Sequence, residues 1–262
     1  MSLIPIREPH ADYHAPSGHW GGHGTMKPVR VVLHDTESHD ATGVTDIEGV
    51  ANFWIGAEAR LGYLPGAHYM TDGDGNLGKF AELNQILNHV GGLNTGSVGI
   101  EQVGDASFTE ADWLARPAQL EEAARLLAYL HVQYKIPLEV PAQQGPGKAM
   151  HGVMTHAMVI RFEPASEGHT DPGAGYPLAV VLKTARAYVA AGGWPQGGGT
   201  LTKQPPKKPR SSPVYQITYT KRNGHRHTIE NHSPALWLGA HPRAKHRGDV
   251  VIHPIHKQKG PA

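Results

Sequence analysis

Short apolar runs along the chain predict the strands of a buried sheet. Residues 28–33 read Pro-Val-Arg-Val-Val-Leu, and this β-branched run is typical of a buried strand. Residues 65–75 predict strand, tight turn and strand, because Asp72-Gly73-Asp74-Gly75 is a hairpin signal. Residues 97–104 predict a further strand, and residues 153–156 are a short apolar segment that ends in a histidine.

Helical spacing appears in three longer segments. Residues 45–59 predict a helix in which Thr45 is the N-cap candidate and Glu48 occupies the capping-box position. The clearest helix covers residues 117–134, with Pro117 in its first turn, and the last covers residues 177–191. We expect the helix at 117–134 to cover the core and to carry no chemistry of its own.

The composition divides the chain into regions. Residues 1–27 are rich in His, Gly and Pro without periodicity and predict an irregular arm, which precedes a main domain at 28–191. Residues 192–213 contain Gly-Gly-Gly and a Pro/Lys-rich run, which is typical of a linker. Residues 214–262 alternate in part and predict a small basic β-rich module or tail.

The charge is distributed unevenly between these regions. Residues 196–262 hold 12 Lys/Arg and two acids, a net charge of +10, whereas the preceding 195 residues have a net charge of −9. Opposite signs in adjacent regions indicate two modules with different partners. The basic region would suit nucleic acid, acidic cell-wall polymers, or a merely solubilising role.

Other features limit the class of protein. The chain has no cysteine, so any zinc must be held by His, Asp or Glu. No stretch approaches 18 consecutive apolar residues, and we expect no membrane insertion. The N-terminus lacks a basic region followed by an apolar run, so no secretory signal peptide is expected.

Candidate chemistry is concentrated in residues 167–173, Glu-Gly-His-Thr-Asp-Pro-Gly. Asp171 is a plausible metal ligand because the following Pro-Gly holds the chain in a turn, and His169 shares its face if the segment is extended. A metal needs further ligands. His34 and His156 end short apolar segments, and Glu101 lies between apolar neighbours. From the residues alone, His34 can equally be an ordinary strand-end residue, and Glu101 can lie on a solvated face.

Several short segments then occur in one order. They are Val-Val-Leu-His-Asp-Thr at 31–36, Ala-His-Tyr at 67–69, His-Val-Gly-Gly at 89–92, Ser-Val-Gly-Ile-Glu at 97–101, Thr-His at 155–156 and Thr-Asp-Pro-Gly at 170–173. Together they resemble the zinc-dependent N-acetylmuramoyl-L-alanine amidases of the phage-lysozyme, bacterial-amidase and peptidoglycan-recognition-protein superfamily. The resemblance covers roughly residues 28–191 and implies an α/β fold with a central mixed β-sheet flanked by helices.

The resemblance also implies a site. The expected zinc ligands are His34, His156 and Asp171, and Glu101 is the expected general base. His169 stands where the family often has a lysine that stabilises the oxyanion, and we expect His169 to take that role. His169 as third ligand in place of Asp171 stays an open alternative.

Further residues carry weaker implications. Trp54 and Asn94 are the expected substrate contacts, whereas His68 and His89 are expected to support the site rather than to bind the metal. Ala67 stands where some relatives carry a catalytic tyrosine, which places more weight on Glu101. The implied reaction is hydrolysis of the amide between N-acetylmuramic acid and L-alanine in peptidoglycan.

The expected biological setting combines these features. An amidase domain with a basic appendage and no signal peptide resembles a phage endolysin, made in the host cytoplasm and reaching the wall through a holin-type lesion. Acidic wall polymers are then the expected partner of the basic region, rather than nucleic acid. The alternatives are a protein of the same fold that binds peptidoglycan without cutting it, and a cytosolic amidase that recycles muropeptides.

Overall fold

A six-stranded mixed sheet forms the centre of the main domain, in the order β2-β5-β4-β6-β3-β7. The computed structural model describes residues 2–15, 24–38, 44–142, 150–159, 168–196, 214–220, 226–231 and 251–255. The strands are β2 (Tyr13–His14), β3 (Arg30–Asp35), β4 (Tyr69–Thr71), β5 (Leu77–Lys79), β6 (Ser97–Gln102) and β7 (Gly152–Thr155). Neighbours in the sheet run parallel except β4 and β5, which form the expected antiparallel pair.

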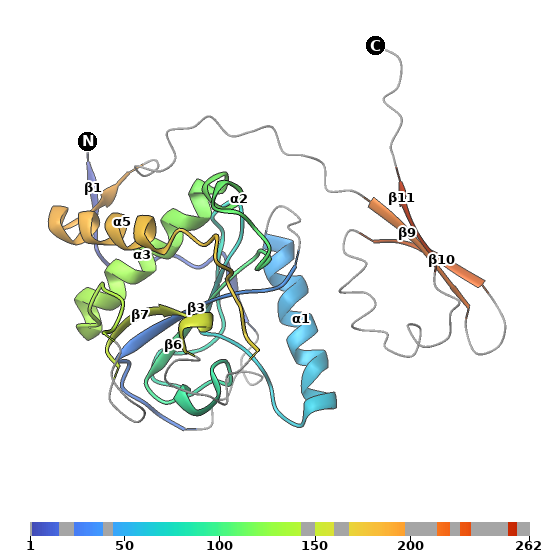
Figure 1. Cartoon of the computed structure of the whole chain (residues 1–262), viewed down its shortest axis with the longest axis horizontal. Coiled ribbons are helices and arrows are strands. Elements are labelled where there is room, and N and C mark those ends of the chain that lie inside the picture. The colour runs from blue at the N-terminus through green and yellow to red at the C-terminus, as the bar shows by residue number, and fades with distance from the viewer. Residues whose placement is uncertain are drawn as a thin grey trace, which may run out of the picture.

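Helices cover both faces of this sheet (Figure 1). On one face, α3 (Pro117–Tyr134) and α5 (Leu178–Ala191) pack in a core that includes Leu33 of β3 and Ile100 of β6. On the other face, α1 (Val44–Leu61) buries Ile47 and Val50 with Met70 of β4. Every residue of β3 is buried, as expected for a central parallel strand covered on both sides. The α/β fold with helices on both faces of a mixed sheet is therefore confirmed.

Short elements complete the domain. They are α2 (Glu110–Leu114), α4 (His156–Val159) and the 3-10 turn η1 (Gly91–Leu93). Thr109 and Asp112 close a capping box at the start of α2. By itself α2 is far too short to be stable, so its position is set by packing of the fully buried Trp113.

The N-terminal residues differ from the expected irregular arm. β1 (Leu3–Pro5) pairs antiparallel with β8 (Gly193–Pro195), which directly follows α5, and β2 joins the edge of the main sheet beside β5. Asp12 strengthens this edge, because its Oδ2 accepts the backbone N–H of Leu77 at 2.9 Å. Residues 2–15 therefore pair with the main domain at two places, the strand after α5 and the β5 edge of the central sheet.

The C-terminal region contains β9 (Val214–Thr220), β10 (Arg226–Asn231) and β11 (Val251–Ile255). These strands form an antiparallel sheet in the order β10-β9-β11, which agrees with the alternating sequence pattern. Within the part of the chain that the structure describes, no helix has the length and apolar character needed to cross a membrane.

Candidate active site

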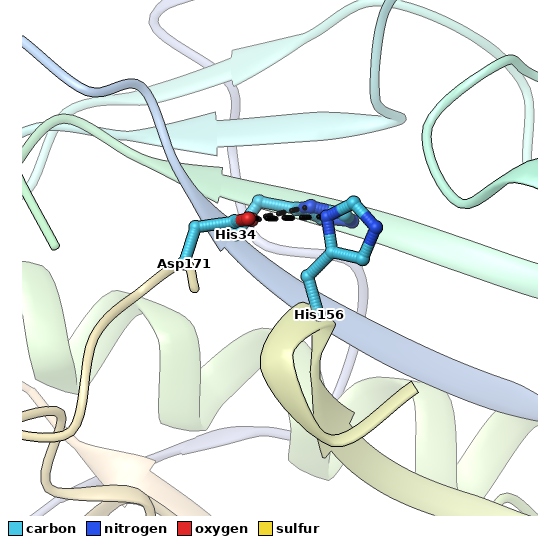
Figure 2. Close-up of side chains that lie close together, drawn as sticks. All are labelled: His34, His156 and Asp171. Atoms are coloured by element: carbon cyan, nitrogen blue, oxygen red, sulfur yellow. Dashed lines mark hydrogen bonds and ion pairs between the residues drawn. The ribbon is translucent and has the colours of Figure 1, made fainter. Parts of the chain in front are cut away.

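Three side chains predicted as metal ligands meet at the carboxyl ends of two adjacent strands. β3 and β7 are parallel, with Leu33 opposite Thr155, so His34 and His156 are the next residues at neighbouring strand ends. Asp171 approaches from the loop before α5, and Figure 2 shows its carboxylate facing both rings. All three residues are buried, and one ligand atom from each lies within 4.8 Å of the others.

The carboxylate is held by both histidines. Asp171 Oδ2 lies 3.0 Å from His34 Nδ1 and 3.2 Å from His156 Nδ1. Burial alone would raise the pKa of Asp171, but the neighbouring imidazoles of His156 and His34 outweigh it and hold that pKa well below its usual range. Asp171 is therefore ionised in a buried site.

The Pro-Gly turn that follows fixes the position of this carboxylate. Gly173 has a φ of +84°, and a Cβ there would lie 2.1 Å from the carbonyl oxygen of Ala106. Only glycine fits so close to that backbone. The backbone oxygen of Asp171 also accepts the N–H of Ala157 in α4, at 3.0 Å, which ties the carboxylate loop to the helix that His156 begins.

This donor set fits a zinc ion. Two imidazole nitrogens and one ionised carboxylate are ligands that zinc takes in catalytic sites, where the fourth position stays open for water or substrate. The site is concave. Its pocket has a volume of about 560 Å³ and is lined by His34, His156 and Asp171.

Glu101 lies beside the ligand set because of the strand register. β6 runs parallel to β3 with Glu101 opposite His34, and Glu101 lines the same pocket. Its Oε2 is buried and has no hydrogen-bond partner among the described residues. Burial, followed by the negative charges of Asp171 and Asp35, raises the pKa of Glu101 well above its usual value. A carboxylate with a raised pKa is a stronger base than an ordinary one, which suits proton transfer.

His169 lies next to the ligands but outside the buried set. Its ring stacks on that of His156 with centroids 3.9 Å apart, and its Nδ1 is 3.5 Å from Asp171 Oδ1. Its side chain is 55% exposed, whereas that of Asp171 is 10% exposed. The geometry therefore favours Asp171 over His169 as the third ligand. Glu167, at the start of the predicted stretch, lies outside the described residues.

Both predicted substrate contacts line the pocket. Trp54 reaches it from α1, and its ring packs edge-on against Phe80 at 5.3 Å. Asn94 also has an internal role that the sequence did not reveal, because its Oδ1 accepts the backbone N–H groups of His89 and Val90 at 3.1 and 2.8 Å. Asn94 thereby shapes the glycine-rich loop at the pocket wall.

The structure adds Asp35 to the site and shows which atoms the expected supporting residue His89 contacts. Asp35 lines the pocket, and burial, together with the charges of Glu37 and Asp171, raises its pKa to about 7 although its carboxylate accepts the backbone N–H of Glu37. His89 contacts a ligand directly, with its Nδ1 3.0 Å from His34 Nε2. Burial, followed by the neighbouring histidines, lowers the pKa of His89 well below its usual value, so the ring is neutral. The sequence signal for His89 was its glycine-rich loop just before β6.

His68 is fully buried, with its ring centroid 6.0 Å from that of His89, and yields a prediction about stability. Its Nε2 faces the carbonyl of Gln85 at 3.0 Å and its Nδ1 accepts the N–H of Gly99 at 3.1 Å, while burial lowers its pKa to about 4. In the unfolded chain, His68 binds a proton as the pH falls below about 6.5. In the folded chain, it binds that proton only as the pH falls below about 4. The free energy of unfolding should therefore fall by roughly 3 kcal/mol from this residue as the pH drops through that window.

Urea unfolding at several pH values measures this effect. His68→Gln should flatten the dependence between pH 6.5 and 4. An equal slope in the parent chain and the variant would contradict the assignment to His68.

The chain belongs to the N-acetylmuramoyl-L-alanine amidase family (Amidase_2), whose sequence pattern matches residues 24–174. That segment contains β3, β6, β7 and all five residues expected to bind the metal or to act in catalysis. No curated protein sequence is significantly similar to the chain.

Solved structures that resemble the chain come from enzymes and recognition proteins. The endolysin amidase LysCS of Clostridium intestinale is 15% identical, with 68% of this chain and 97% of that chain covered and a TM-score of 0.45. The Staphylococcus aureus hydrolase AmiA is 16% identical, with 71% and 87% covered and a TM-score of 0.49. The Drosophila peptidoglycan recognition protein SD is 17% identical, with 61% and 84% covered and a TM-score of 0.46.

Proposed function

We propose that this chain is a zinc-dependent hydrolase that cleaves the amide bond between N-acetylmuramic acid and L-alanine in peptidoglycan. The observation that carries the proposal is the buried set of His34, His156 and Asp171, with Glu101 beside it in one pocket. The match to the amidase family supplies the substrate class.

The chain's own residues account for the proton transfers. His34, His156 and Asp171 would hold the zinc, which when bound supplies a Lewis acid for the amide carbonyl and lowers the pKa of a water. Glu101 accepts a proton from the attacking water and passes it to the departing amine of L-alanine. The products are a lactyl carboxylate and a free N-terminal amine.

His169 and the pocket wall orient the substrate in this proposal. The exposed ring of His169 donates a hydrogen bond to the developing oxyanion, and its stacking on His156 limits its movement. Trp54 and Asn94 contact the glycan or the stem peptide.

Metal removal tests the proposal. After dialysis against a chelator, the chain should release no free L-alanine amine from purified peptidoglycan. One equivalent of zinc should restore the activity and calcium should not, since nitrogen ligands suit zinc and calcium takes oxygen. Full activity in the chelated protein, with no zinc detected by elemental analysis, would contradict zinc dependence.

A second candidate function is binding of peptidoglycan without cleavage. The complete ligand set favours the enzyme. Beside it lies Glu101 Oε2, which has no hydrogen-bond partner among the described residues, and a purely binding site has no need of such a buried carboxyl group. A recycling amidase for soluble muropeptides is disfavoured by the net charge of +10 in residues 196–262, which such an enzyme does not require.

We further propose that the chain acts as an endolysin on the bacterial cell wall, with the basic C-terminal region attracting acidic wall polymers. Deletion of residues 197–262 should reduce co-sedimentation with walls by roughly tenfold or more, because one of two linked attachments is lost. Binding of the parent chain should also weaken as salt rises.

A charge variant provides the matched control for that deletion. Changing Lys203, Lys207, Lys208 and Arg210 to Gln keeps the length of the chain and should reproduce part of the loss. Unchanged sedimentation in both variants would remove the targeting role, and tighter binding to DNA than to walls would reassign it.

A further inference from the structure

His89 connects a predicted metal ligand to the backbone of β6. Its Nδ1 lies 3.0 Å from His34 Nε2, and its Nε2 lies 3.3 Å from the carbonyl oxygen of Ser97. The rings of His34 and His89 meet edge to face, with centroids 5.2 Å apart and an interplanar angle of 79°. The Ser97 carbonyl, His89 and His34 therefore form a series of hydrogen bonds, and the other nitrogen of His34 faces Asp171.

The direction of these hydrogen bonds follows from the carbonyl at one end. A carbonyl oxygen only accepts, so Nε2 of His89 carries the hydrogen, and in this tautomer Nδ1 has a free lone pair. That lone pair accepts the Nε2–H of His34. His34 Nδ1 is then left without a hydrogen, 3.0 Å from the carboxylate of Asp171. Two electron-pair donors facing each other favour a cation at this position.

We propose that His89 is a positioning residue that holds His34 in the tautomer whose Nδ1 lone pair faces the metal position. The inference rests on the proposed zinc function and concerns how the ligand set is prepared for the ion. Hydrogen-bond partners of metal-bound histidines generally fix the tautomer and the ring orientation in this way.

The surroundings of His89 are built to seat its ring. A Cβ at Gly99 would lie 2.8 Å from His89 Nδ1 and 3.0 Å from His89 Cγ, so the lack of a side chain at Gly99 leaves the space that the imidazole fills. Asn94 Oδ1 holds the backbone N–H of His89 from the other side at 3.1 Å.

Arg30 holds the loop around Ser97, whose carbonyl oxygen accepts the hydrogen bond from His89. Arg30 Nη1 donates to Ser97 Oγ at 3.0 Å and to the carbonyl oxygens of Leu93 and Thr95 at 3.1 and 2.9 Å. The buried guanidinium thus fixes the loop that enters β6. It thereby also fixes the Ser97 carbonyl oxygen, which sets the direction of the hydrogen bonds through His89.

Two readouts that do not depend on amidase activity test this inference. The ¹⁵N chemical shifts of His34 in the zinc-free protein report its tautomer, and competition with a chromophoric chelator gives the zinc dissociation constant. In the parent chain, His34 should carry its hydrogen on Nε2. His89→Phe keeps a planar ring but removes both nitrogens, and should abolish the tautomer preference and weaken zinc binding by roughly 10- to 100-fold.

Further variants separate positioning from general damage. His89→Asn retains an acceptor near the Nδ1 position and should recover most of the zinc affinity. Gly99→Ala changes no polar group, yet it presses on the ring and should weaken zinc binding. His131→Gln, remote on α3, should leave both readouts unchanged.

An Nδ1–H tautomer of His34 in the parent chain would overturn the inference, as would unchanged zinc affinity in both His89→Phe and Gly99→Ala. A chain that binds zinc in this His89-dependent way but cleaves no peptidoglycan would refute the proposed function and leave this inference standing.

Discussion

Asp171→Ala is expected to abolish stoichiometric zinc binding and, with it, peptidoglycan hydrolysis. The substitution removes the ionised carboxylate that faces His34 Nδ1 at 3.0 Å and His156 Nδ1 at 3.2 Å. His34 and His156 remain, which leaves zinc without its carboxylate ligand. Zinc affinity should fall by more than roughly a hundredfold, the upper range for loss of an outer hydrogen-bond partner. Elemental analysis after gel filtration measures zinc content, and turbidity of a wall suspension measures hydrolysis.

His169→Ala is the matched control for this prediction. His169 stacks on His156 only two residues before Asp171, but its side chain is largely exposed. The variant should keep one equivalent of zinc while losing activity, because its expected role is toward the oxyanion. Retained zinc in Asp171→Ala together with lost zinc in His169→Ala would exchange the two assignments.

Glu101→Gln should lower kcat by roughly 10²- to 10⁴-fold, the usual contribution of a general base, and leave zinc affinity nearly unchanged. Glutamine has almost the same shape but cannot accept the proton of the attacking water. The buried position opposite His34 allows little rearrangement to compensate. Stopped assays on a soluble muropeptide give kcat, and chelator competition gives the zinc affinity.

A second buried carboxyl group serves as the control for Glu101. Glu121 on α3 is 1% exposed and lies outside the pocket, so Glu121→Gln should leave kcat at the parent level in a folded protein. Parent-level kcat in Glu101→Gln would contradict the assigned mechanism, even with the fold and the metal site intact.

The long helices and the central strands were predictable from the sequence. The expected helix at 117–134 coincides with α3, and that at 177–191 with α5 within one residue. Long amphipathic segments repeat their apolar spacing over several turns. Pro117 indicates where α3 begins, because a helix tolerates proline in its first turn and not in its interior. The strand at 28–33 was recognisable because β3 is buried on both faces.

The N-terminal strands were not predictable in the same way. β1 and β2 have three and two residues, too few for a period to appear. Their partners, β8 and β5, lie far along the chain, so tertiary pairing rather than local pattern determines them.

The site was predictable only in part. The order of short segments indicated His34, His156, Asp171 and Glu101. The strand register brings His34, His156 and Glu101 to one pocket, and Asp171 reaches it from the loop before α5. Their roles stay predictions. The choice between Asp171 and His169 required burial, which residue spacing does not give.

The contacts of the supporting residues were not predictable, for a related reason. The internal contacts of Asn94 and the link from His89 to His34 depend on the conformation of the glycine-rich loop. Local spacing does not determine that conformation, because glycine permits many backbone angles.

Mass spectrometry of purified peptidoglycan digested with the zinc-loaded chain tests the central claim most directly. We predict free stem peptides that begin with an unblocked L-alanine, together with glycan strands whose muramic acids carry a free lactyl carboxylate. Intact stem peptides still joined to muramic acid, with cuts only between sugars or within the peptide, would contradict the account.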